Sequence, residues 1–127
     1  MEVRWLTREI VLAIHARSLR DHGGAAGLRD DGMLEGALGR PQNLAAYGSP
    51  DVFELAASYA FALVKNHPFL DGNKRTAFLA AYVFLGLNGF EPDADEAEAA
   101  AIVVDLAASN VSEADFARWL EAVSRRI

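Results

Sequence analysis

Residues 52–87 read VFELAASYAFALVKN-HPFLDGNKR-TAFLAAYVFLGL, two almost continuous apolar runs joined by a polar segment. The first run is apolar at every position of 52–64 except Glu54 and Ser58. A helix that is apolar on nearly all sides is buried from several directions. The run therefore predicts a central helix, which ends just before Pro68 because a residue that precedes proline disfavours helical backbone.

The second run predicts another core helix, from about Asn73 to Leu87, which the pair Asn88-Gly89 ends. A loop of about six residues is thus expected between the two core helices. Both runs fall short of the ~20 apolar residues that a membrane-spanning helix needs. No membrane contact is expected.

Working outward, further helices are expected on both sides of this pair. Before it, Thr7 caps a helix that runs to about His22, and Asp31 begins a short helix that ends around Gly39 and Pro41. Residues 41–49 are expected to be a loop.

The Ser49-Pro50-Asp51 triplet predicts the start of the central helix, with Ser49 as the cap and Pro50 as the first helical residue. Towards the C-terminus, Asp93 with Glu96 predicts a helix to about Ser109, and Ser112 with Asp115 predicts the last one. About six helices emerge, with at most a short extended piece at 3–6. The expected fold is all-α, a single domain over residues 1–127.

Composition restricts the function. The chain has no cysteine, which excludes disulfides, thiolate nucleophiles and cysteine-based zinc sites. The formal net charge is −6, and residues 93–127 carry eight acidic and three basic side chains, a net −5. Direct nucleic-acid binding would favour a basic surface, so it is not expected. The first 15 residues mix charges into their apolar pattern and form no signal peptide, which predicts a cytoplasmic protein.

Ligand binding explains the composition of the polar segment His67–Arg75 better than helix stability does. Lys74 and Arg75 fall in the first turn of a helix, where cations cost about 0.3–1 kcal/mol each because that end of a helix is partly positive. Free backbone N–H groups, Gly72 and two cations together indicate an anion site, with phosphate as the obvious anion. Asp71 is a candidate Mg²⁺ ligand, and the imidazole of His67 can accept a proton from an attacking hydroxyl.

The string HPFLDGNKR resembles the signature of the Fic/Doc superfamily, His-x-Phe-x-(Asp/Asn/Glu)-(Gly/Ala)-Asn-(Gly/Lys)-Arg, at all nine positions. The flanking residues 62–66 and 76–77, and the stretch from 27–30 to 41–42, also resemble its Doc branch. The resemblance implies a compact helical fold in which the motif links two central antiparallel helices. It makes His67 the catalytic histidine and Phe69 the buried anchor of the loop. It further makes Asp71 the Mg²⁺ ligand and gives phosphate binding to Gly72, Asn73, Lys74 and Arg75.

Lys74 indicates the branch. Fic enzymes that transfer AMP typically have glycine at this position and a second arginine three residues after the first, where this chain has Phe78. The resemblance is therefore to Doc toxins of type II toxin-antitoxin systems. It implies an ATP- and Mg²⁺-dependent kinase that modifies a hydroxyl of elongation factor Tu and so arrests translation. It also implies a Phd-type antitoxin whose segment folds into a groove on the toxin.

Two alternatives stay open, a Fic-like AMP or nucleotide transferase and a catalytically silent helical binding module. Among the other residues, His15 and His22 lie two turns apart on one helix, but they have no acidic or cysteine partner at ligand spacing. We expect no metal there. Trp5 and Trp119 are interpreted as packing residues.

Overall fold

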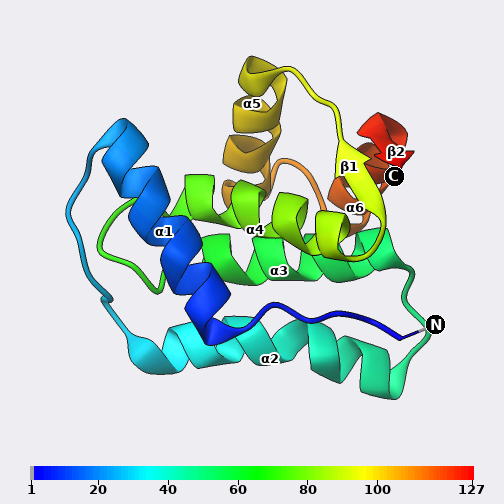
Figure 1. Cartoon of the computed structure of the whole chain (residues 1–127), viewed down its shortest axis with the longest axis horizontal. Coiled ribbons are helices and arrows are strands. Elements are labelled where there is room, and N and C mark those ends of the chain that lie inside the picture. The colour runs from blue at the N-terminus through cyan, green and yellow to red at the C-terminus, as the bar shows by residue number, and fades with distance from the viewer. Residues whose placement is uncertain (1) are drawn as a thin grey trace.

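The computed structural model describes residues 2–127, and over that range it confirms an all-helical fold (Figure 1). The helices are α1 (Arg8–His22), α2 (Asp31–Tyr47), α3 (Val52–Asn66), α4 (Asn73–Leu87), α5 (Glu96–Ala107) and α6 (Glu113–Val123). Helices α3 and α4 run antiparallel through the centre (Figure 1). Helices α2 and α6 pack on α3, whereas α1 and α5 pack on α4. Within the described residues no helix has the length and hydropathy to span a membrane.

Both ends of α1 and α4, and the C-terminal end of α3, agree with the pattern analysis. Thr7 caps α1 by accepting a hydrogen bond from the Ile10 N–H at 3.2 Å, and Gly23 ends it with φ 80°. The predicted six-residue loop is present, because α3 ends at Asn66 and α4 begins at Asn73. These boundaries could be predicted because local signals, a cap and a chain-breaking residue, set them.

The predicted end of α2 was wrong. The helix continues through Gly39 and Pro41 to Tyr47, so residues 41–47 are helical instead of a loop. A proline inside a helix costs about 3 kcal/mol. Here Pro41 is buried against the core, and the preceding Arg40 makes a two-pronged ion pair with Glu113 at 2.6 and 2.8 Å. Tertiary contacts therefore offset the local penalty.

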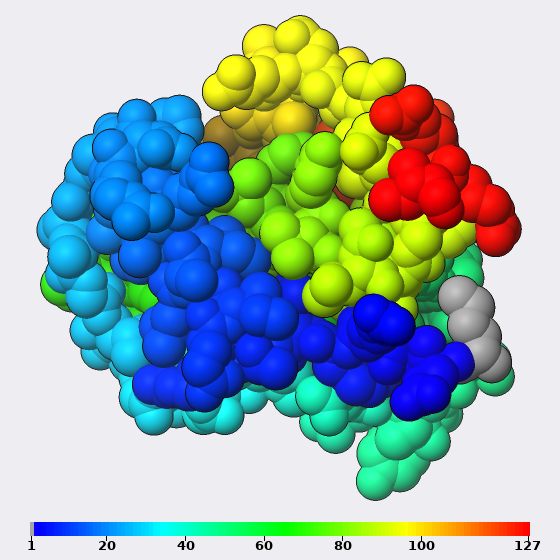
Figure 2. Space-filling view, viewed as in Figure 1, coloured from blue at the N-terminus to red at the C-terminus, as the bar shows by residue number. Residues whose placement is uncertain are grey.

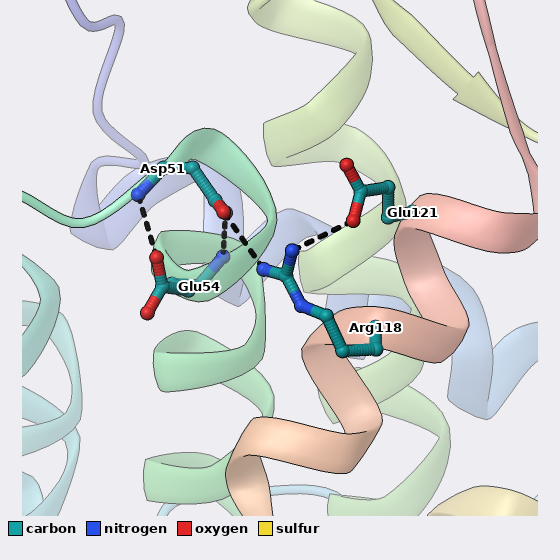
Figure 3. Close-up of polar contacts among 4 residues, drawn as sticks. All are labelled: Asp51, Glu54, Arg118 and Glu121. Atoms are coloured by element: carbon teal, nitrogen blue, oxygen red, sulfur yellow. Dashed lines mark hydrogen bonds and ion pairs between the residues drawn. The ribbon is translucent and has the colours of Figure 1, made fainter.

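The predicted cap of α3 was also wrong, by two residues. Asp51 caps the helix instead of Ser49, and it forms a capping box with Glu54. Arg118 of α6 donates to Asp51 at 2.7 Å and to Glu121 at 2.6 Å (Figure 3). Burial raises the pKa of Asp51, but the hydrogen bonds from Arg118 and from the Glu54 backbone outweigh it and leave the pKa below its usual value. The cap thus also ties α6 to α3.

Two short strands were missed. Strands β1 (Phe90–Pro92) and β2 (Ser124–Arg126) pair antiparallel, with Phe90 opposite Arg126. At three residues each they carry little sequence signal. The expected extended piece at 3–6 forms no strand; the side chain of Asn88 instead hydrogen-bonds both the N–H and the carbonyl of Arg4. Helix α5 begins after Asp95, two residues later than expected.

The core is a single cluster of buried apolar side chains centred on α3 and α4. Tyr59 and Phe84 pack at a ring distance of 5.2 Å, and both are fully buried. Trp5 and Trp119 pack against the core, as interpreted from the sequence. The hydroxyl of Tyr59 accepts a hydrogen bond from the Leu6 N–H at 3.1 Å, which fastens the N-terminal segment. Burial raises the pKa of Tyr59 to about 12.

Tyr59→Phe is expected to lower the free energy of unfolding by about 1 kcal/mol at neutral pH, because the buried Leu6 N–H loses its acceptor. The raised pKa means that the neutral phenol stabilises the fold below pH 10, and that this contribution is lost as the pH rises towards 12. Urea unfolding at pH 7 and above pH 10 measures both effects. A mutant and wild type that lose stability equally above pH 10 would contradict the assignment to Tyr59.

Candidate functional site

The loop between α3 and α4, residues 67–72, has an unusual backbone at both ends. His67 follows α3 in the left-handed region at φ 54°, and its N–H donates to the carbonyl of Leu63. Gly72 precedes α4 in the same region at φ 79°. A non-glycine residue rarely adopts this conformation, which costs roughly 1–2 kcal/mol. The imidazole of His67 is held on a strained backbone, so other contacts must fix the loop.

Asn73 fixes the loop from inside. Its side chain is buried, its Oδ1 accepts from the Phe69 N–H at 3.0 Å, and its Nδ2 donates to the Phe69 carbonyl at 2.9 Å. Nδ2 also faces Nδ1 of His67 at 3.2 Å. The Phe69 backbone fixes the orientation of the Asn73 side-chain amide, so an Nδ2–H of Asn73 points at the imidazole of His67. The Asn73 side chain therefore holds the loop and the histidine, and only its backbone N–H remains for a phosphate.

The segment after α1 fixes the loop from outside. The N–H groups of Arg29 and Asp30 both donate to the Pro68 carbonyl, at 2.7 and 3.1 Å, and the Leu70 N–H donates to the Gly27 carbonyl at 3.1 Å. Leu28 and Phe69 form an isolated antiparallel bridge. In Figure 1 the loop between α3 and α4 lies beside the α1–α2 connection, at the same end of the molecule.

Arg29 adds a side-chain clamp. Its Nε donates to the carbonyl of His67 at 2.6 Å and its Nη2 donates to the carbonyl of Asn66 at 2.8 Å. These carbonyls are at the C-terminal end of α3, which is partly negative and favours a cation. The guanidinium therefore closes α3 and holds the backbone of His67 directly.

Asp71 is hydrogen-bonded through both its backbone and its side chain. Its carbonyl lies 2.8 Å from Nε2 of His15, and its carboxylate accepts from its neighbour Gly72 at 2.8 Å and from Ala25 at 3.4 Å. Gly24 has φ 125°, a conformation that other residues rarely adopt, and a Cβ there would lie 2.8 Å from the same carboxylate, so the position favours glycine. The carboxylate remains exposed at the surface.

The first turn of α4 is open to an anion. Gly72 offers no side chain to cap the N–H groups, and the acidic residues that usually occupy a first turn are absent. Lys74 and Arg75 are both exposed, and among residues 2–127 neither makes an ion pair. Exposed cations beside uncapped amides are an arrangement to which an anion can bind.

The predicted residues converge on one pocket. A cavity of about 270 Å³ is lined by His67, Asp71, Gly72, Asn73, Lys74 and Arg75. All six lining residues belong to the polar loop and the start of α4. Phe69 lies beneath the loop and is buried, as expected of an anchor.

An apolar groove of about 360 Å³ adjoins the pocket between α4 and α5, and Lys74 and Arg75 line both. Its walls include Phe78, Tyr82 and Val104. In Figure 2 the green surface of α4 lies between the blue end of α1 and the yellow-to-gold start of α5. The apolar surface near the site is thus a separate groove next to the polar pocket.

Sequence reasoning missed three contributors to the site: His15, Gly24 and Arg29. His15 was considered only as a metal ligand with His22, and within the described residues no cluster of three or more possible ligands exists. A signal was available, since Val11, His15 and Ser18 share the buried face of α1 and one of them is a titratable residue. Arg29 gives no such signal, because its partners are backbone carbonyls far along the chain.

Asn73→Ala is expected to cost roughly 2–3 kcal/mol of unfolding free energy, because the buried N–H and carbonyl of Phe69 both lose their partner. Lys74→Ala is the matched control in the same helical turn. It should leave stability unchanged or raise it by about 0.3–1 kcal/mol, since it removes a cation from the positive end of α4. Urea unfolding of both variants tests the difference; equal losses would contradict the role given to Asn73.

Comparison with known proteins agrees with this geometry. The model of the Fic/DOC family matches residues 5–85, which include α1, the loop and most of α4. A relative from Escherichia phage P1, named protein kinase doc, is 35% identical over 119 residues, covering 93% of this chain and 94% of the relative. A second relative, toxin Doc of Mycolicibacterium smegmatis, is 40% identical over 94 residues, covering 72% of this chain and 69% of the relative. The chain therefore belongs to the Fic/DOC family, in its Doc branch.

Proposed function

We propose that this chain is the toxin of a type II toxin-antitoxin system, which transfers the γ-phosphate of ATP to a protein hydroxyl. The observation that carries the proposal is the uncapped first turn of α4, where Lys74 and Arg75 lie free beside the imidazole of His67. The names of the two relatives, a protein kinase and a toxin, support the same reading.

The site fits the phosphates of a nucleotide. Phosphate oxygens accept hydrogen bonds from the backbone N–H groups of a helix start, and the two cations neutralise their charge. The first turn of α4 has no side-chain cap to displace. The triphosphate would therefore bind through the amides of residues 73–75 and the side chains of Lys74 and Arg75, since the Gly72 N–H already donates to the Asp71 carboxylate.

The site also fits Mg²⁺. The exposed carboxylate of Asp71 lines the same pocket as the two cations, and Mg²⁺ in nucleotide sites often has one or two protein carboxylates, with water and phosphate oxygens as its other ligands. Asp71 would hold the ion against the triphosphate, where a bound Mg²⁺ neutralises charge on the transferred group.

His67 would act on the acceptor hydroxyl. The hydroxyl oxygen forms a bond to the γ-phosphorus while the bond from that phosphorus to the β-phosphate oxygen breaks, which releases ADP; the hydroxyl proton goes to the imidazole. Nδ1 of His67 faces the Asn73 amide at 3.2 Å. The exposed imidazole would therefore exchange this long hydrogen bond for one from the hydroxyl.

Phe78 favours phosphate transfer over AMP transfer. Fic enzymes that transfer AMP typically have a second arginine at this position. In this chain Phe78 lines the apolar groove and packs with the rings of Tyr82 and Trp119, so it offers no cation to the phosphates. Lys74 is instead the second cation and lies one residue before Arg75.

The resemblance to Doc toxins suggests the acceptor protein and the antitoxin. We propose elongation factor Tu as the modified protein, so that the modification arrests translation in the cytoplasm. We propose a Phd-type antitoxin whose apolar helix occupies the groove between α4 and α5. That groove is apolar and shares Lys74 and Arg75 with the phosphate pocket, so its occupant would lie next to the active site.

His67→Ala is expected to lower the rate of transfer by about 10²–10⁴-fold, because the hydroxyl loses its proton acceptor. Purified wild type and mutant are incubated with Mg²⁺, ATP and elongation factor Tu, and the intact mass of the factor is measured. An added phosphate group supports the proposal. An added nucleoside monophosphate would contradict phosphate transfer and support the AMP-transferase alternative.

A growth-arrest assay distinguishes the enzyme proposal from the alternative of a catalytically silent binding module. Expression of wild type should stop growth, and His67→Ala should relieve the arrest while the mutant protein stays folded by circular dichroism. Tyr47→Ala, at an exposed residue of α2 that lines neither the pocket nor the groove, is the control and should arrest growth as wild type does. If His67→Ala arrests growth as strongly as wild type, the silent binding module is the better description.

Val104→Glu is expected to weaken antitoxin binding by at least tenfold, because Val104 is half exposed in the apolar groove and a carboxylate there must be desolvated. Leu44→Glu, an exposed apolar residue of α2 outside the groove, is the matched control. Calorimetric titration with the purified antitoxin compares the two. If the two variants bind the antitoxin with equal affinity, the antitoxin does not occupy this groove.

A further inference from the structure

His15 is a buried titratable residue to which neither the sequence nor the proposed function gives a role. It lies on α1 and is 5% exposed. Its ring stacks on Phe69, with ring centroids 3.7 Å apart and planes at 8°, and its Nε2 lies 2.8 Å from the Asp71 carbonyl oxygen. One imidazole from α1 thus contacts both the anchor and the metal-ligand candidate of the loop.

The direction of the hydrogen bond follows from its partner. A carbonyl oxygen can only accept, so Nε2 of His15 carries a hydrogen and donates it to Asp71. The peptide between Asp71 and Gly72 is planar and trans, so its C=O and its N–H point in opposite directions. With the carbonyl held towards α1, the Gly72 N–H lies on the other side, where it meets the Asp71 carboxylate at 2.8 Å.

The imidazole lies close to the 71–72 peptide. Its Nε2 is 2.8 Å from the Asp71 carbonyl oxygen, and a Cβ added to Gly72 would lie 3.6 Å from the same nitrogen. A turn of the 71–72 peptide would leave the Nε2–H and the carbonyl without partners. Losing such a partly buried bond costs roughly tenfold or more in the population of the held state.

We infer that His15 is a positioning residue of the phosphate site: by holding the Asp71 carbonyl, it fixes the 71–72 peptide, whose N–H in turn holds the Asp71 carboxylate in place beside the pocket. The inference rests on the proposed function for the identity of the ligand, Mg²⁺ with ATP. The geometric part, which residue orients the 71–72 peptide, is independent of what the pocket binds.

Two variants separate the two contacts of the ring. His15→Phe keeps the stack on Phe69 and removes the donor, whereas His15→Gln keeps an N–H donor at similar reach and removes the ring. Ser18→Ala is the control, because Ser18 lies on the same buried face of α1 and its hydroxyl has no partner within the described residues. Melting temperature and circular dichroism are recorded for all of them.

Affinity for Mg²⁺–ATP is measured by calorimetry. We expect His15→Phe to lose roughly tenfold in affinity, and His15→Gln and Ser18→Ala to stay within about threefold of wild type. If His15→Phe binds as wild type does, or if losses in all variants simply follow their losses in melting temperature, the positioning role is overturned.

Nuclear magnetic resonance tests the orientation of the 71–72 peptide in the absence of any ligand. In wild type, long-range ¹H–¹⁵N spectra should show the His15 hydrogen on Nε2, and the Gly72 amide signal should move in His15→Phe but much less in His15→Gln. A hydrogen on Nδ1 in wild type, or an unmoved Gly72 signal in His15→Phe, overturns the inference even if the variant folds poorly. If wild type fails to bind Mg²⁺–ATP, the proposed function fails, whereas these signals still decide the role of His15.

Discussion

The hydrogen bonds between the Asn73 amide and the backbone of Phe69 are the constraint on which the site depends. They close residues 69–73 into a tight turn, bury Phe69 under it, and aim an N–H at the imidazole of His67. A loop between two core helices could otherwise adopt many conformations, and each ordered residue costs about 1–2 kcal/mol of backbone entropy. One buried amide therefore converts a connection into a rigid site.

The region from α1 to α2 completes that constraint from outside. His15 holds the carbonyl of Asp71, Gly24 admits its carboxylate, and Arg29 holds the carbonyl of His67. Most of these contacts use backbone atoms of the loop, which leaves the side chains of Lys74 and Arg75 free. The loop is thus held by its backbone, and its charged groups face the pocket.

The first turn of α4 is electrostatically unfavourable in the free protein. Cations at the positive end of a helix destabilise it slightly, and the glycine cap gives no side-chain hydrogen bond in return. A bound phosphate would satisfy both the amides and the cations. The cost is small beside the burial of the core around α3 and α4, so the fold tolerates a site that is unfavourable while it is free of anions.

The sequence by itself determined the two central helices, the six-residue loop and the residues that line the pocket, because apolar pattern, Pro68 and Gly72 act locally. It did not determine that α2 continues through Pro41, because the ion pair of Arg40 with Glu113 joins segments far apart in the chain. Nor did it determine that the Asn73 side chain serves the loop, or that His15 and Arg29 hold it, since these contacts depend on how α1 packs on α4 and how the α1–α2 connection meets the loop. Local signals set where elements begin and end, whereas packing alone decides which distant atoms meet.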